Sequence, residues 1–344
     1  MSSNRFSVAD QTRQSHPIDP SEPFNLSWVR GKTIVITGGA SGFGASFFKK
    51  WATAGANVII GDVDDAKGES IVRTVRTATD NRNHHYLHCD VTDWQSQVNF
   101  FKQASKLSPH GGIDAVVANA GVADVKAKFN EPENLDMDYP PKPDMRVLDV
   151  NLVGVLYTTH LALFYLPRNP GSEPADPNKT AKHGVLGLFR SLRITAFTKG
   201  VRVNMVCPYF VDTGILTPPG RMLLAGTNLA QVEDVVEAGS RLMADSRISG
   251  RNLVVGPRLS IVKTEQGEWQ YCRQEDNQNA MEVSLWEVHT DDLETSDVFM
   301  RRVVGLMNAA QEMRGWILWT KDMAKVLFDM VKTAEWRETE ETGE

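Results

Sequence analysis

A glycine-rich turn between an apolar run and a helix-forming run is the feature that most constrains this chain. Residues 33–37 read TIVIT, a β-branched run typical of a buried strand. GGASGFGASFFKK follows at once, with Gly38, Gly42 and Gly44 spaced G-x-x-x-G-x-G. Such glycines let backbone approach a pyrophosphate, and the N-terminus of the next helix favours negative charge. The unit predicts a dinucleotide-binding α/β fold; the alternative is a βα turn with incidental glycines.

A second strand with an acidic end supports the dinucleotide interpretation. Residues 56–65 read ANVIIGDVDD, an apolar run that reaches Asp62, 18 residues after Gly44. An acid at this place accepts hydrogen bonds from the adenosine ribose and repels a 2′-phosphate. The spacing therefore predicts NAD, with NADP less favoured. The alternative is that Asp62 is a solvent-exposed acid in a loop, which explains the spacing less well.

Two further strands are expected, one ending at Asp90 and one over residues 113–121. The first contains His84, His85 and His88, which raise the possibility of a metal site. No paired carboxylate or cysteine accompanies them, and alternation along a strand explains them more simply. We therefore predict no metal. The second run, IDAVVANAG, ends in small residues that allow close backbone approach at the carboxyl edge of the sheet.

Together these segments resemble the short-chain dehydrogenase/reductase family. TGGASGFG, GDVDD, CDVTD, NAG (119–121) and DVNLVG (149–154) occur in the order and spacing of that family. The likeness runs from about residue 32 to residue 257 and is interrupted near 167–181. It implies an α/β fold, a Rossmann-type doubly wound parallel sheet with helices on both faces.

The resemblance also implies a set of cofactor contacts. It assigns Gly38, Ser41, Phe43 and Gly44 to the pyrophosphate, Asp62 to the adenosine ribose, Asp90 and Val91 to the adenine, Asn119, Ala120 and Gly121 to the nicotinamide ribose, and Thr213 to the carboxamide. Tyr209 stands where many members have glycine, which is a departure from the pattern.

Only part of the family's catalytic set has a match. Members use a tyrosine as acid or base, a lysine that lowers its pKa and holds the ribose, a serine on the substrate oxygen, and an asparagine in the preceding helix. Asn151 matches the asparagine, in a helix expected from about residue 145 to 166. Lys182 matches the lysine, at the start of an amphipathic helix.

The tyrosine and serine have no match. The tyrosine position, four residues before Lys182, is Asn178, and residues 167–179 read PRNPGSEPADPNK. A central parallel strand needs an apolar run, and proline cannot donate to its ladder. We therefore expect a sheet that lacks strand five and leaves the fourth and sixth strands with unpaired edges, unless residues 259–288 fill the gap. The cause is a deletion in the protein or a splice-boundary error in the translated sequence.

The sequence divides into three parts. Residues 1–27 are expected as a flexible tail, 28–258 as the Rossmann domain and 259–344 as a carboxyl-terminal extension. Within the extension, residues 259–288 are strand-like, and apolar residues recur at helical spacing over 299–313 and 316–330. These helices are expected to pack on the main domain or on a second subunit. Contact with a membrane surface is a less favoured alternative.

Composition limits the remaining choices. A net charge of −6 over 344 residues argues against nucleic acid as a partner, and three dispersed cysteines fit a reducing, cytoplasmic setting. The resemblance implies an oxidoreductase, expected as a homo-oligomer, that moves a hydride between nicotinamide and a secondary alcohol or ketone of a small lipophilic metabolite, in secondary-metabolite biosynthesis. The alternative is a catalytically impaired pseudoenzyme that binds dinucleotide and acts as an interaction module.

Overall fold

The fold is described from a computed structural model. The described positions are 18–19, 21–123, 138–139, 142–169, 179–182, 188–189, 192, 196, 200–213, 221, 224, 228–264, 269–272, 280–287, 309 and 313. The chain divides into two compact units, Gln14–Asp291 and a second made of Met1–Arg13 with Asp292–Glu344. The two helices expected between residues 299 and 330 lie outside the described residues, apart from Ala309 and Met313, which are helical.

Strands and helices alternate along the first unit, as the βα pattern predicts. The first half contains η1 (Ser27–Val29), β1 (Thr33–Thr37), α2 (Gly42–Thr53), β2 (Asn57–Asp62), α3 (Asp65–Thr79), β3 (His85–His88), α4 (Trp94–Leu107) and β4 (Ala115–Val117). The second half contains α5 (Arg146–Leu148), η2 (Asp149–Gly154), α6 (Val155–Tyr165), η3 (Leu166–Arg168), β5 (Lys179–Lys182), β6 (Val201–Pro208), α9 (Val232–Ala244), β7 (Asn252–Lys263), β8 (Trp269–Tyr271) and β9 (Met281–Glu287).

The described strands form one sheet in the order β3-β2-β1-β4-β5-β6-β7-β8, with β9 also paired to β7. From β3 to β7 every pair is parallel, and Thr33 on β1 stands beside Asn57 on β2. The order reverses between β1 and β4, which is the switch point where ligands of such sheets bind. The expected doubly wound α/β fold is confirmed.

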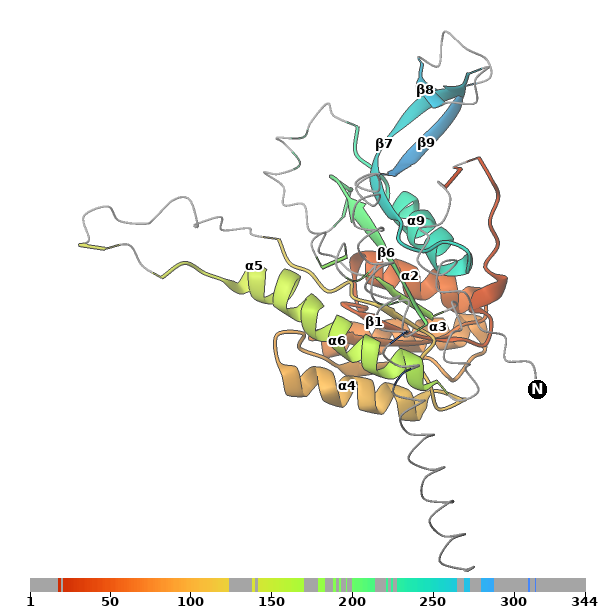
Figure 1. Cartoon of the computed structure of the whole chain (residues 1–344). Coiled ribbons are helices and arrows are strands. Elements are labelled where there is room, and N and C mark those ends of the chain that lie inside the picture. Colours follow the sequence, from red (N-terminus) through yellow and green to blue (C-terminus); the bar gives the residue numbers. More distant parts are fainter. Residues whose placement is uncertain are drawn as a thin grey trace, which may run out of the picture. The chain divides into compact units, whose positions relative to one another are not determined.

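Each face of the sheet carries its own apolar core (Figure 1). On one face α2 and α9 pack together through Phe47, Trp51 and Leu242, and the Trp51 indole donates to Ser240 Oγ at 2.9 Å. On the other face α4 and α6 pack through Phe101 and Leu161. Helices on both faces explain why the central strands are apolar throughout rather than alternating.

One helical run is unusually apolar. Arg146–Arg168 spans 23 residues, and its most apolar stretch of 18 residues has a mean hydropathy of 1.5, which by length and composition alone is enough to cross a membrane. One side of α6 is buried in the second core through Thr158, Leu161 and Ala162. In the described part of the chain it is therefore a core helix of the α/β fold, whose outer side is also apolar.

The expected gap in the sheet is not present. Residues Lys179–Lys182 form β5, which pairs in parallel with β4 through Ala115 and with β6 through Val201. The expectation that strand five is absent was wrong in this respect, because backbone hydrogen bonding to two neighbouring strands does not require apolar side chains. Residues 259–288 do not fill the gap.

Instead, β8 and β9 lengthen the sheet on the β7 side (Figure 1). Both pair with β7 in antiparallel fashion. β7 runs unbroken across residue 258, the predicted boundary of the Rossmann domain. The end of the predicted tail is also held in place, because the Ile18 backbone N–H donates to Glu287 Oε1 at 3.2 Å and Arg241 donates to the Glu22 carbonyl at 2.7 Å.

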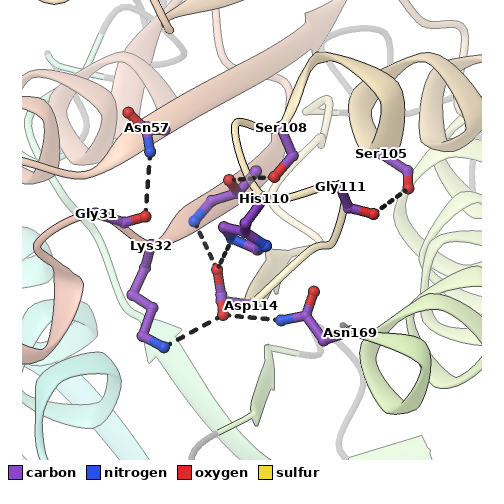
Figure 2. Close-up of polar contacts among 10 residues, drawn as sticks. Gly31, Lys32, Asn57, Ser105, Ser108, His110, Gly111, Asp114 and Asn169 are labelled. Atoms are coloured by element: carbon purple, nitrogen blue, oxygen red, sulfur yellow. Dashed lines mark hydrogen bonds and ion pairs between the residues drawn. The ribbon is translucent and has the colours of Figure 1, made fainter. Parts of the chain in front are cut away.

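A buried carboxylate ties the amino ends of β1 and β4 together (Figure 2). Asp114 is 6% exposed and accepts from the Thr33 backbone N–H, His110 Nε2 and Asn169 Nδ2, each at 2.8 Å. Lys32 Nζ lies 3.4 Å from Asp114 Oδ1, the oxygen that accepts from Asn169. This cluster lies at the edge of the sheet opposite the glycine-rich turn, so its role is structural.

We expect Asp114→Asn to lower the free energy of unfolding by roughly 2–4 kcal/mol, because a buried charge that satisfies several donors is lost. Urea denaturation followed by circular dichroism measures the change. The matched control is Asp144→Asn, an exposed carboxylate that is paired with Arg146 in the described part of the chain, which should change stability by less than about 0.5 kcal/mol. Equal effects of the two substitutions would contradict the structural role of Asp114.

Candidate nucleotide site at the carboxyl edge of the sheet

The glycine-rich turn after β1 leaves no room for side chains at two positions. A Cβ on Gly44 would lie 2.1 Å from the Gly38 carbonyl oxygen and 2.7 Å from Asn119 Nδ2. Gly38 has φ +66°, and a Cβ there would lie 2.6 Å from the Ala120 Cα. Ser41 is the residue before α2, and Phe43 packs on the core below the turn. The turn therefore presents bare backbone and the first N–H groups of α2, as a pyrophosphate requires.

The segment after β4 is fastened to this turn. Asn119 Nδ2 donates to the carbonyls of Thr37 and Gly38, both at 3.0 Å. The Thr37 hydroxyl accepts from the backbone N–H groups of Asn119 at 3.1 Å and Ala120 at 3.3 Å. Thr37 was not among the predicted site residues. Its place as the last residue of β1, beside β4, is the signal that could have identified it.

Asp62 is placed as the sequence predicts, at the last residue of β2. Its Oδ2 accepts from the Ala40 backbone N–H at 3.0 Å and its Oδ1 accepts from the Asp64 backbone N–H at 3.1 Å. These bonds fix the carboxylate beside the glycine-rich turn. The remaining lone pairs of both oxygens are free to accept from ribose hydroxyls.

A second acid lies beside Asp62. Asp65 accepts hydrogen bonds from the Tyr86 hydroxyl and from His88 Nδ1, the latter at 2.8 Å, and these contacts lower the pKa of the Asp65 carboxyl. The Tyr86 hydroxyl also donates to the Asp62 carbonyl at 2.8 Å, and burial together with Asp65 raises its pKa. The sequence did not predict this group, since it depends on the register between β2 and β3.

Asp90 and Val91 follow β3 at the same edge. The Asp90 carboxylate accepts from the Thr92 backbone N–H and hydroxyl, at 2.9 and 2.7 Å. Val91 is buried, and its carbonyl accepts from Gln97 Nε2 at 2.7 Å. The same amide reaches the Gly154 carbonyl at 3.0 Å, so the loop is fastened to η2.

Asn151 lies in η2, a π-helical turn of a kind often found at functional sites. Its Oδ1 accepts from the Val122 backbone N–H and its Nδ2 donates to the Val122 carbonyl, both at 2.9 Å. A Cβ on Gly121 would lie 3.3 Å from Asn151 Oδ1. The amide therefore positions the chain after β4.

One predicted site residue, Lys182, is placed differently from the rest. Lys182 was expected at the start of a helix, but it is the last residue of β5. The helix is present only further along, at Leu188, Phe189 and Leu192 among the described residues. Thr213 follows β6 at the carboxyl edge, and its carbonyl accepts from Arg221 at 3.4 Å. Asn178 lies outside the described residues.

The histidines of the third strand have structural partners. His84 is fully buried, its Nδ1 accepts from the Val58 backbone N–H at 3.3 Å, and burial lowers its pKa to about 4. His85 contacts Arg76, and His88 contacts Asp65. Within the described ranges no group of three His, Cys, Asp or Glu side chains could hold a metal ion.

The fold and this edge define a nucleotide-binding α/β protein of the Rossmann type. A family model described as short chain dehydrogenase matches residues 32–172. The chain is 34% identical over 269 residues to 5′-hydroxyaverantin dehydrogenase of Dothistroma septosporum, covering 68% of this chain and 87% of that protein. It is 33% identical over 261 residues to (+)-borneol dehydrogenase 1 of Salvia officinalis, covering 68% and 95%. The chain belongs to the short-chain dehydrogenase/reductase family of oxidoreductases.

A solved structure shows the same fold. The 3-ketoacyl-(acyl-carrier-protein) reductase from Brucella melitensis, complexed with NADH, has a TM-score of 0.53 at 22% identity and covers 66% of this chain and 97% of its own. The alignment with the Dothistroma protein spans 269 positions but 68% of this 344-residue chain, so that relative contains residues without a counterpart here. The family match ends at residue 172, inside the proline-rich segment.

Proposed function

We propose that the chain binds NAD at the carboxyl edge of the sheet and is an oxidoreductase for a secondary alcohol or ketone of a small lipophilic metabolite. The observation that carries the proposal is the cradle at Gly44, where a Cβ would meet the Gly38 carbonyl and the Asn119 amide. A turn that excludes side chains, followed by a helix N-terminus, fits a pyrophosphate. When bound, the nicotinamide supplies hydride transfer.

The chain's own residues divide the binding between them. Gly38, Ser41, Phe43 and Gly44 would surround the pyrophosphate, and Asp62 would accept from the adenosine ribose. Asp90 and Val91 would flank the adenine, Asn119, Ala120 and Gly121 the nicotinamide ribose, and Thr213 the carboxamide. The hydrogen bonds from Asn119 to the turn and from Asn151 to the segment after β4 support this assignment, because they fix the two loops before a ligand arrives.

Charge at the ribose end favours NAD over NADP. Asp62, Asp64 and Asp65 lie together at the end of β2, and Asp65 is held there by Tyr86 and His88. Lys67 is already paired with Asp64 at 2.7 Å, so its charge is balanced. A 2′-phosphate at this place would meet carboxylates rather than a free cation.

We expect NADH to bind about tenfold or more tightly than NADPH, because the phosphate is repelled by the fixed Asp62 carboxylate. Fluorescence titration of both cofactors measures the ratio. Asp62→Ala should reduce the ratio of the two affinities. Asp144→Asn, which changes a surface acid outside the site, should leave the ratio unchanged. Equal affinities in the unaltered protein would contradict the assignment of Asp62.

The catalytic half of the site supports a second candidate function. A catalytically impaired dinucleotide-binding module is favoured by one observation, the placement of Lys182 in β5 rather than in a helix. No tyrosine stands four residues before Lys182, where the sequence has Asn178. The residues of the Dothistroma relative without a counterpart here support a loss of residues from this chain.

The relatives support the substrate class. They include proteins named as dehydrogenases of 5′-hydroxyaverantin, borneol and secoisolariciresinol, the last from Forsythia intermedia at 31% identity over 277 residues, covering 71% of this chain and 94% of that protein. We therefore place the chain in secondary-metabolite biosynthesis. The exposed stripe of Leu156, His160 and Phe164 on α6, next to Trp94, supports a homo-oligomer.

A further inference from the structure

Two large aromatic side chains stand in solvent directly after β6. Tyr209 is 67% exposed and Phe210 is 44% exposed, and their rings form an edge-to-face pair with centroids 4.7 Å apart. Their backbone is fixed, since the Tyr209 N–H donates to the Val255 carbonyl at 2.8 Å and the Phe210 carbonyl accepts from Ala230 at 3.1 Å. The pair is therefore a rigidly mounted apolar surface at the carboxyl edge of the sheet.

A third aromatic residue reaches this edge from the carboxyl-terminal extension. Trp286 on β9 pairs with Val254 on β7, and its indole lies over Gly256. A Cβ on Gly256 would lie 2.9 Å from Trp286 Cζ3, so the glycine provides the space that the ring occupies. β9 runs beside β7 at this end of the sheet (Figure 1).

The register places the three rings along one edge. Pro208 stands beside Val255 as the last pair of this ladder, and the next residue, Tyr209, is still bonded to β7 through its N–H, which donates to the Val255 carbonyl. Cys207 stands beside Val254, which in turn stands beside Trp286. Cys207, Val254 and Trp286 therefore lie side by side across three strands, at the end of β6 that leads into Tyr209 and Phe210, and the Trp286 ring covers Gly256.

From this arrangement we infer that Tyr209, Phe210 and Trp286 form an aromatic edge that selects substrates with a fused aromatic ring system. Planar rings stack on or against exposed aromatic side chains, and ligand sites are commonly lined by them. The edge continues the carboxyl edge that holds the proposed cofactor site. The inference rests on the proposed function. It concerns the ring system of the substrate, which the aromatic edge would hold away from the reacting carbon.

The test compares two ketones that differ only in the ring system. 2-Acetonaphthone and cyclohexyl methyl ketone are titrated against the full chain by calorimetry, with and without NADH. We expect the naphthyl ketone to bind about tenfold more tightly, and we expect Tyr209→Ala and Trp286→Leu each to weaken its binding about 3- to 10-fold. Neither substitution should change the affinity for NADH, which is measured separately.

Tyr271→Ala is the matched control, because Tyr271 is 68% exposed on β8 of the same extension but outside the aromatic edge. It should leave the affinity for both ketones unchanged. Equal binding of the two ketones, or an equal loss in Tyr271→Ala, would overturn the inference. Absence of NADH binding would overturn the proposed function instead, and the ketone ratio without NADH would still decide for or against the aromatic edge.

Discussion

Inserting the strand–serine–tyrosine segment of a close relative between Asp176 and Thr180 is expected to raise turnover of a secondary alcohol at least about a hundredfold, because positioned proton transfer is typically worth 10²–10⁴-fold. The unaltered chain has Asn178 at the tyrosine position, and an amide neither gives nor takes a proton near neutral pH. Steady-state assays that follow NADH absorbance with both proteins measure the ratio.

The insertion also changes which residues form the strand between β4 and β6. Lys-Thr-Ala-Lys occupies the place between β4 and β6, which holds Lys182 in a strand. An inserted apolar strand would compete for that place, since both faces of a central parallel strand are covered. Lys182 would then be free to enter the following helix, one turn after the new tyrosine, where its charge lowers the pKa of the phenol.

A second insertion separates proton transfer from refolding of the sheet. The same segment with phenylalanine in place of its tyrosine should restore strand pairing without restoring turnover. Both inserted proteins should bind NADH as the unaltered chain does, because the glycine-rich turn and Asp62 lie elsewhere. Full activity of the unaltered chain would show that another group moves the proton, with Tyr209 as the first residue to test.

The nucleotide half of the site was readable from the sequence because its signals are local. The strand over 33–37 has the bounds of β1, and Asp62 is the last residue of β2. In both cases an apolar run ends at the carboxyl edge of the sheet, where its last residue, Thr37 or Asp62, belongs to the proposed nucleotide site. The strand pair after residue 258 was likewise visible as apolar runs that β7, β8 and β9 use.

The contacts that the sequence missed depend on register between distant segments. Thr37 holds Asn119 and Ala120 because β1 pairs with β4, and Asp65 meets Tyr86 because β2 pairs with β3. β5 was missed for another reason. Its residues have no apolar run, and it is held by backbone hydrogen bonds to two neighbours, which no side-chain pattern encodes.

Gly44→Ala is expected to weaken NADH binding on the order of a hundredfold or more, since a misplacement of about 1 Å at a binding group can have that effect. The new Cβ would lie 2.1 Å from the Gly38 carbonyl oxygen, which is backbone and cannot rotate away. It would also lie 2.7 Å from Asn119 Nδ2, the amide that fastens the turn to β4. The turn must therefore move relative to the N-terminus of α2. The turn and the helix would then no longer present their backbone N–H groups together to the pyrophosphate.

The matched control is Gly31→Ala, at the amino side of β1. Gly31 has φ +72° and nothing within 4 Å of a new Cβ, so alanine there adds backbone strain of roughly 1–2 kcal/mol without a clash. Both variants should lose some stability in urea, but only Gly44→Ala should lose the cofactor. NADH binding within about threefold of the unaltered protein in Gly44→Ala would place the dinucleotide elsewhere, because a pyrophosphate in this turn requires the bare backbone at residue 44.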